Sequence, residues 1–144
     1  MSSEMPKALI FDIGASYARV GLSGSDLPSK VFPSLIGSQK TIFGNSMGDK
    51  LYGNEVLDKR TVLNLTQLIK AGKIQNWEDI EFIWQMIYNQ EVKVDTKEHP
   101  VLYSTYANEE NVSKERTCLV FFETFNVPGF FTAIHPLLSL YALG

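Results

Sequence analysis

The sequence predicts an α/β fold in which a central β-sheet is layered by α-helices. An apolar run over 8–13 ends at Gly14 and is typical of a buried strand, and the stretch 76–90 repeats apolar residues at helical spacing. Strand-like and helix-like segments then alternate to the end of the chain, which is the pattern of an α/β sheet. The 144 residues, 44% of them hydrophobic and 20% charged, have the size and composition of one packed domain.

The N-terminal elements read as a β-hairpin followed by a third strand. After the strand at 8–13, residues alternate between apolar and polar from Tyr17 to Leu22, which predicts a second strand. A third short strand is expected around Val31 and Phe32, and Pro33 ends it or places it at an edge.

The middle of the chain is rich in glycine. Gly37 to Gly53 contains four glycines and only scattered apolar residues, which predicts a mobile surface loop with a short strand near 50–52. Apolar residues over 62–68 predict another strand, ended by the Ala71–Gly72 pair.

The clearest helix signal lies at 76–90. Asn76 suits an N-cap, and Glu78 and Asp79 suit the first turn. A strand after Pro100, a helix over 108–125, a strand over 129–135 and a helix opening at Pro136 complete the pattern. The aromatic residues of this part have core spacing and are expected inside the fold: Trp77, Trp84, Phe121, Phe122, Phe125, Phe130 and Phe131.

Charge and cysteine content exclude several classes of function. The formal net charge is −3 and no basic run is present, which argues against direct binding of nucleic acid or an anionic membrane. Cys118 is the single cysteine, so an intrachain disulfide and a multi-cysteine metal site are excluded. No signal peptide and no bilayer-spanning apolar stretch is present, which leaves the cytosol, the nucleus and the cytoskeleton open.

The hairpin at Asp12 and Gly14 has the form of a phosphate cradle. A strand–glycine–strand turn aims backbone N–H groups at an anion, and a nearby cation assists. The same residues are also common in hairpin turns that bind no ligand. On the loop alone, an ordinary hairpin turn is the favoured interpretation.

Three longer stretches carry a specific resemblance. "NWEDIEFIW", "EHPVLYS" and "FFETFNVPGFFTAIHPLLSLYALG", in that order, resemble the actin family, and "VFPSLIG" and the Asp12 hairpin fall in the family's order too. The resemblance covers nearly all of the chain except the glycine-rich loop, and only the first half of an actin. It implies the N-terminal half of an actin-like, ribonuclease H-like ATPase fold, with the C-terminal half absent. A larger subdomain is expected over about 1–32 and 69–144 and a small inserted subdomain over about 33–68, as in actin subdomains 1 and 2.

The resemblance also implies a site for ATP or ADP with magnesium. Asp12 matches the family's metal-side aspartate and Arg19 its phosphate-binding lysine, but Ala15 replaces a serine and Ser16 a glycine. The hairpin is therefore expected to be a modified cradle that binds phosphate weakly. Its candidate residues are Asp12, Gly14, Ala15, Ser16, Tyr17 and Arg19.

His135 stands where the family places a glutamine near the attacking water. A histidine there is a candidate general base. The alternative, which is favoured, is that His135 is a hinge residue whose side chain is hydrogen-bonded to the backbone. Past it, the resemblance implies a partner-binding surface formed by Leu138, Leu140, Tyr141 and Leu143. The expected partners are actin, actin-related proteins or other complex subunits.

Three functional hypotheses follow from the resemblance. The first is a divergent actin-related protein that serves as a structural, non-hydrolysing subunit of a larger cytoskeletal assembly in the cytoplasm, with the nucleus as the alternative location. The second is a nucleotide-dependent, filament-forming actin-like ATPase of which this is the N-terminal part. The third, ranked last, is a truncated protein that caps or sequesters ordinary actin.

Overall fold

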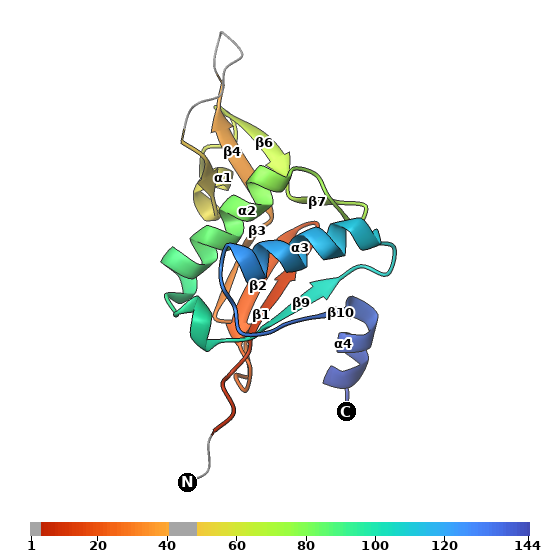
Figure 1. Cartoon of the computed structure of the whole chain (residues 1–144). Coiled ribbons are helices and arrows are strands. Elements are labelled where there is room, and N and C mark those ends of the chain that lie inside the picture. Colours follow the sequence, from red (N-terminus) through yellow and green to blue (C-terminus); the bar gives the residue numbers. More distant parts are fainter. Residues whose placement is uncertain (1–3, 41–48) are drawn as a thin grey trace.

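The computed structural model describes residues 4–40 and 49–144. Its main sheet has five strands in the order β10-β9-β1-β2-β3, labelled in Figure 1. These strands are β1 (Leu9–Ile13), β2 (Tyr17–Leu22), β3 (Lys30–Pro33), β9 (Val101–Thr105) and β10 (Phe130–Ile134). β1, β2 and β3 form an antiparallel meander, whereas β9 and β10 run parallel to β1.

A smaller antiparallel sheet stands above the main one and has the order β5-β4-β6 (Figure 1). Its strands are β4 (Leu35–Gln39), β5 (Leu51–Tyr52) and β6 (Leu63–Gln67), and the short helix α1 (Asn54–Asp58) lies beside them. A two-stranded hairpin follows, made of β7 (Ile69–Lys70) and β8 (Lys73–Ile74).

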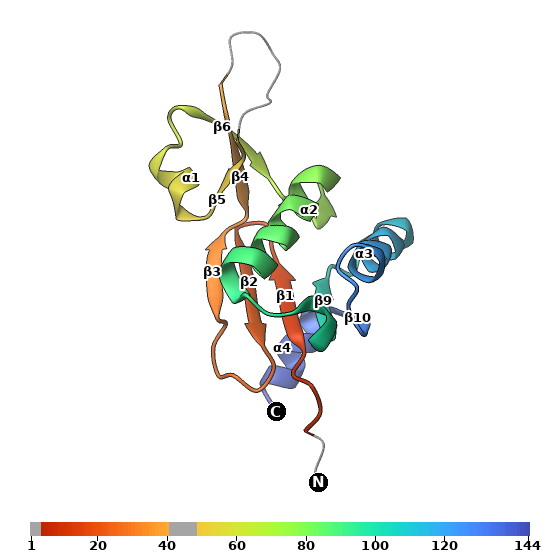
Figure 2. The ribbon, with the colours of Figure 1, turned by 60° about the vertical axis from the view of Figure 1, so that its left-hand side comes forward.

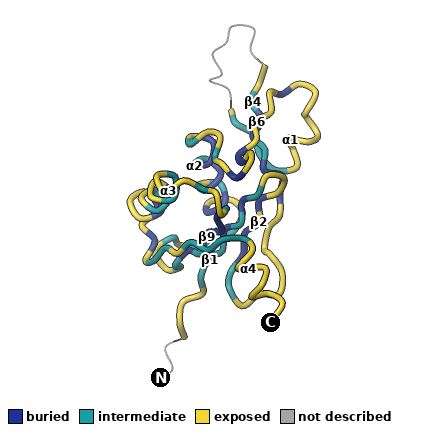
Figure 3. Tube along the Cα trace, turned by 90° about the vertical axis from the view of Figure 1, so that its right-hand side faces the viewer, coloured by how far each residue is buried: buried dark blue, intermediate teal, exposed yellow. Residues whose placement is uncertain are grey.

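Helices lie on both sides of the main sheet. α2 (Trp77–Met86) and α3 (Asn111–Glu123) cover one face, and α4 (His135–Ala142) lies on the other side (Figures 2 and 3). The Asn76 side chain caps α2 by accepting from the Asp79 N–H at 3.1 Å. α2 continues as a π-helical segment (Ile87–Val92), which ends at Lys93 in the left-handed conformation, and a 3₁₀ turn (Thr96–Glu98) leads to β9. The predicted α/β fold is confirmed.

The core lies between the sheet and the helices α2 and α3. Leu9, Phe11 and Ile13 alternate with less buried residues along β1, so one face of that strand points to the core. Aromatic rings fill the centre, and the fully buried Phe121 lies 4.9 Å from Trp84 and 5.2 Å from Phe11 between ring centroids. This arrangement gives the large apolar area that stabilises a chain of this length.

Two of the aromatic residues expected in the core lie on the surface instead. Phe131 is 69% exposed and Phe122 is 42% exposed. Phe131 follows Phe130 in β10, and successive side chains of a strand point to opposite faces. Phe130 therefore reaches the core, and Phe131 points away from it.

The glycine-rich stretch differs from its prediction at its N-terminal end, where residues 37–39 belong to β4 and not to a loop. The short strand predicted near 50–52 is confirmed as β5, and it is followed by a helix over Asn54–Asp58 that the sequence pattern did not indicate. A Cβ added at Gly37 would lie 2.7 Å from the Leu63 Cδ1, so close strand pairing explains this glycine. The central part of the predicted loop, 41–48, lies outside the described residues.

The Tyr88 hydroxyl is an unusual polar group in this core. It is buried, and among the described residues it has no hydrogen-bond partner. We expect Tyr88→Phe to raise the free energy of unfolding by up to about 1 kcal/mol, because it removes a desolvated group that gains no bond. Chemical denaturation monitored by circular dichroism checks this.

Tyr52→Phe is the matched control. The Tyr52 hydroxyl donates to the Glu91 Oε1 at 2.7 Å, so its removal is expected to lower the free energy of unfolding by about 1–2 kcal/mol. Equal losses in the two variants would show that the Tyr88 hydroxyl is bonded.

Candidate functional site

The turn between β1 and β2 is closed by its own backbone. The Gly14 N–H donates to the Tyr17 carbonyl at 2.9 Å, and a Cβ added at Gly14 would lie 3.2 Å from that oxygen. The Ser16 carbonyl accepts from the Ser34 N–H at 2.9 Å, which joins the turn to the segment between β3 and β4. The sequence places a glycine here because the turn closes tightly.

Tyr106, just after β9, reaches the same turn. Burial raises the pKa of its hydroxyl, and a hydrogen bond with the Ala15 backbone opposes that rise. The Tyr106 hydroxyl would lie 3.7 Å from a Cβ added at Gly14, so it lies beside the turn. The Gly14 amide is bonded within the chain, while the Ser16 and Tyr17 side chains are exposed.

Asp12 is the centre of a polar cluster at one end of the main sheet. Its Oδ1 accepts from the Ser104 Oγ at 2.8 Å and lies 3.3 Å from the His135 Nδ1, and its Oδ2 lies 3.7 Å from the Arg19 Nη1. The β1–β2 register sets Arg19 directly opposite Asp12. Ser104 lies in β9, beside β1, so parallel pairing brings it to the same end of the sheet.

His135 is the first residue of α4 and directly follows β10. Its ring lies against that of Tyr106, with centroids 4.5 Å apart. Its Nε2 is buried and makes no hydrogen bond within the described part of the chain. The ring therefore presents Nδ1 to Asp12 and keeps Nε2 inside the protein.

Glu109 is a partly buried carboxyl group at the edge of the cluster. Burial raises the pKa of Glu109, and a hydrogen bond from the Ser113 Oγ together with the charge of Lys114 opposes the rise. Glu109 begins the segment that enters α3, so the rim of the cluster combines a desolvated carboxyl group with the Tyr106–His135 pair.

Groups that would face a phosphate already have partners within the chain. The Gly14 amide is bonded internally, and the Asp12 carboxylate is shared among a hydroxyl, an imidazole and a guanidinium. Over residues 4–40 and 49–144, no group of three or more histidine, cysteine or acidic side chains is arranged to hold a metal ion. A hollow of about 250 Å³ borders Asp12 and Arg19, but Leu22 and Leu27 also line it.

The sequence-predicted site residues are brought together only in part. Asp12, Arg19 and His135 meet in one cluster, and the Tyr17 ring lies at its edge, 5.9 Å from the Arg19 guanidinium carbon. Ser104 and Tyr106 belong to the cluster and were not predicted. Their signal was available in principle, because both lie at the carboxyl end of the strand predicted after Pro100.

The predicted partner surface on α4 is largely exposed. Leu140 is 66% exposed, Tyr141 70% and Leu143 85%, whereas Leu138 is half-buried. Leu137 is also exposed and was not predicted. An apolar helix with this exposure is typical of an interaction surface.

In a comparison with known families, a family model described as actin matches residues 3–144. In the part of the chain that the structure describes, none of the helices is both long enough and apolar enough to cross a membrane.

Proposed function

Because the chain belongs to the actin family, we propose that it is a divergent actin-related protein acting as a structural, non-hydrolysing subunit of a larger cytoskeletal assembly. The observation that carries this proposal is the internal bonding of the β1–β2 turn. The Gly14 amide and the Asp12 carboxylate, which would be among the groups to face a nucleotide, are already bonded within the chain. A ligand would have to replace these bonds, which lowers its net affinity.

The changed residues of the turn support the same proposal. Ala15 has no hydroxyl to offer a phosphate, and Arg19 directs its guanidinium to Asp12. A planar guanidinium and a lysine ammonium do not place their donors alike. The cluster thus serves to hold the ends of β1, β2, β9 and α4 together.

The exposed side of α4 supports a role in assembly. We assign the partner surface to Leu138, Leu140, Tyr141 and Leu143, and the partners to actin, actin-related proteins or other subunits of a complex. We place this assembly in the cytoplasmic cytoskeleton, with the nucleus as the alternative. The division into a larger subdomain over about 1–32 and 69–144 and a small one over about 33–68 belongs to the same proposal.

One observation favours a second candidate, a nucleotide-dependent, filament-forming actin-like ATPase. The His135 Nε2 is unpaired among the described residues while its Nδ1 faces the Asp12 carboxylate. A carboxylate that orients an imidazole in this way leaves the other nitrogen free to act as a base.

Calorimetric titration of the purified chain with ATP and magnesium tests the two candidates. We expect no binding tighter than about 1 mM and no phosphate release, because the groups that would bind are engaged. A matched variant carries Ala15→Ser, Ser16→Gly, Arg19→Lys and His135→Gln, which restores the family's residues. We expect it to bind ATP more tightly than the unmodified chain.

A tight complex with steady phosphate release from the unmodified chain would contradict the structural role. In that case, loss of release in His135→Gln, with ATP binding retained, would establish the second candidate. If neither chain binds ATP, the turn is structural and the first candidate stands.

A further inference from the structure

The two edges of the main sheet differ in how they are protected against pairing with another strand. β3 forms one edge and carries Lys30 and Pro33, whereas β10 forms the other and has neither a charged residue nor a proline. Lysine and proline on an edge strand oppose pairing with a second chain. The phenylalanine, threonine and isoleucine residues of β10 all favour the strand conformation. β10 is therefore the edge that can accept a further strand.

The backbone of β10 directs hydrogen-bonding groups away from the sheet. The Val101 N–H of β9 donates to the Gly129 carbonyl at 2.9 Å, and β10 runs parallel to β9. In a parallel pair, every second residue of a strand bonds the neighbouring strand and the residues between them face the other way. Counted from Gly129, three residues of β10 direct their N–H groups outward: Phe130, Thr132 and Ile134. Among the described residues, no strand pairs with that edge.

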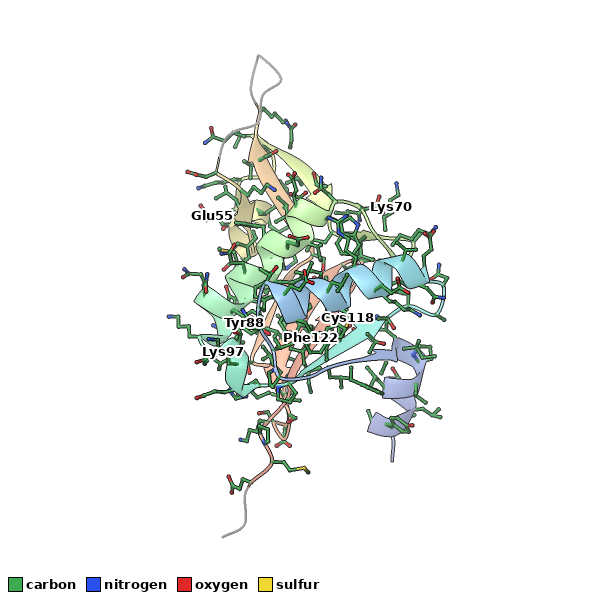
Figure 4. All side chains as sticks on the ribbon, in the orientation of Figure 1. Glu55, Lys70, Tyr88, Lys97, Cys118 and Phe122 are labelled. Atoms are coloured by element: carbon green, nitrogen blue, oxygen red, sulfur yellow. The ribbon has the colours of Figure 1, made fainter. Side chains whose placement is uncertain are left out.

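The side chains along this edge are incompletely covered. The β9 residues in register with Phe130, Thr132 and Ile134 are buried, whereas these three are only half-buried. A hollow of about 320 Å³ lies beside them, and Cys118 of α3 lines it together with Phe130 and Thr132. The exposed Phe122 ring lies 6.4 Å from that of Phe130, and Figure 4 labels both Cys118 and Phe122 on α3. The place of a further strand is thus open and has an apolar wall.

β10 is complementary to itself in an antiparallel register. With Thr132 opposite Thr132 of a second copy, each N–H donates to the other carbonyl, and at each end the Ile134 N–H reaches the Phe130 carbonyl of the other copy. Phe131, which is 69% exposed, then lies beside Ala133 of the second copy, in the kind of pair whose side chains approach closest. A large ring beside a methyl group fills the joint without a clash.

We propose that two copies of this chain associate by antiparallel pairing of their β10 strands, with Thr132 at the two-fold axis, to form one continuous sheet. The axis is perpendicular to the sheet, so both α3 helices lie on the same face, and Cys118 and Phe122 of the two copies cover the joint. The occupant is a strand because the edge offers backbone groups, and it is a second copy because the register is self-complementary. This interface goes beyond the proposed function, because it lies on β10 and not on α4.

Sedimentation velocity of the full chain over a concentration series tests the proposal. We expect a reversible dimer with a Kd on the order of 10 µM, because pairing of one strand and one helix buries a modest area. Phe131→Lys should raise that Kd by at least about fivefold, since it places a charge on the edge at a position where the monomer exposes the side chain. Thr132→Pro should raise it by at least about tenfold, because it removes the central donor and no N–H that bonds β9.

Cys118 reports where the axis lies, because it is the only cysteine of the chain and shares the hollow with Thr132. A short bismaleimide should join the Cys118 side chains of two copies into a covalent dimer. The yield should fall in Thr132→Pro at the same protein concentration, because fewer chains are paired.

Two control variants make the test specific. Val31→Lys changes a half-exposed residue on β3, the opposite edge, and Leu140→Lys changes the exposed surface of α4, and both should leave the Kd unchanged. A chain that stays monomeric up to about 200 µM, a dimer that both β10 variants leave intact, or a dimer that Leu140→Lys dissociates would overturn the proposal. None of these outcomes depends on whether the chain binds ATP.

Discussion

Phe121→Ala is expected to lower the free energy of unfolding by about 3–5 kcal/mol, the largest effect of any single change considered for this chain. The Phe121 side chain is fully buried on the inner face of α3. Its ring packs at centroid distances between 4.9 and 5.8 Å against five others, which are Phe11, Trp84, Tyr103, Phe125 and Phe130. Truncation leaves a cavity that so many large rings cannot all close.

Urea denaturation followed by circular dichroism measures this loss. Phe122→Ala is the matched control, because it removes the same atoms one position along the helix from a side chain that is 42% exposed. Its expected cost is about 1 kcal/mol or less. Equal costs for the two variants would mean that α3 does not present Phe121 to the core.

Gly72→Ala is expected to cost about 2–4 kcal/mol. Ala71 and Gly72 have φ of 51° and 74°, the two left-handed residues of a tight turn between β7 and β8. A Cβ at Gly72 would lie 2.6 Å from the Asn108 Oδ1 and 3.1 Å from the Tyr106 Cγ. The cost therefore combines backbone strain with a steric clash against the ring that supports His135.

Gly24→Ala separates the two contributions. Gly24 has φ of 85°, and a Cβ there would meet no atom within 4 Å, so strain alone is expected to cost about 1–2 kcal/mol. Thermal and urea unfolding of both variants give the difference. If Gly24→Ala cost as much as Gly72→Ala, the packing of the β7–β8 turn on Tyr106 would carry no energy.

The part of the candidate site that depends on the pairing of β1 with β2 could be predicted from the sequence. The turn at Gly14 sets the register of β1 and β2, and that register places Arg19 opposite Asp12. Ser104 and Tyr106 could not be joined to them from the spacing of residues, because strand order in the sheet decides which strand ends meet.

The sequence predicted some elements of the fold and missed others. The helix at α2 begins at the predicted cap, and β1, β2 and β9 lie at their predicted positions, since each has strong periodicity or a clear boundary. β4 was missed because Gly37 weakens its pattern, and its strand conformation depends on pairing with β6. The short α1 has no side-chain cap and only five residues, too few for a periodic signal.

The sequence by itself determined the fold class, the actin-like order of elements and the pairing of Asp12 with Arg19, because periodicity and hairpin register are local properties. Only the tertiary structure decided that Ser104 and His135 meet Asp12 at one end of the sheet and that Phe131 faces outward. These features depend on which distant segments become neighbours. Long-range packing and the desolvation that accompanies it set those contacts, and no residue spacing along the chain encodes them directly.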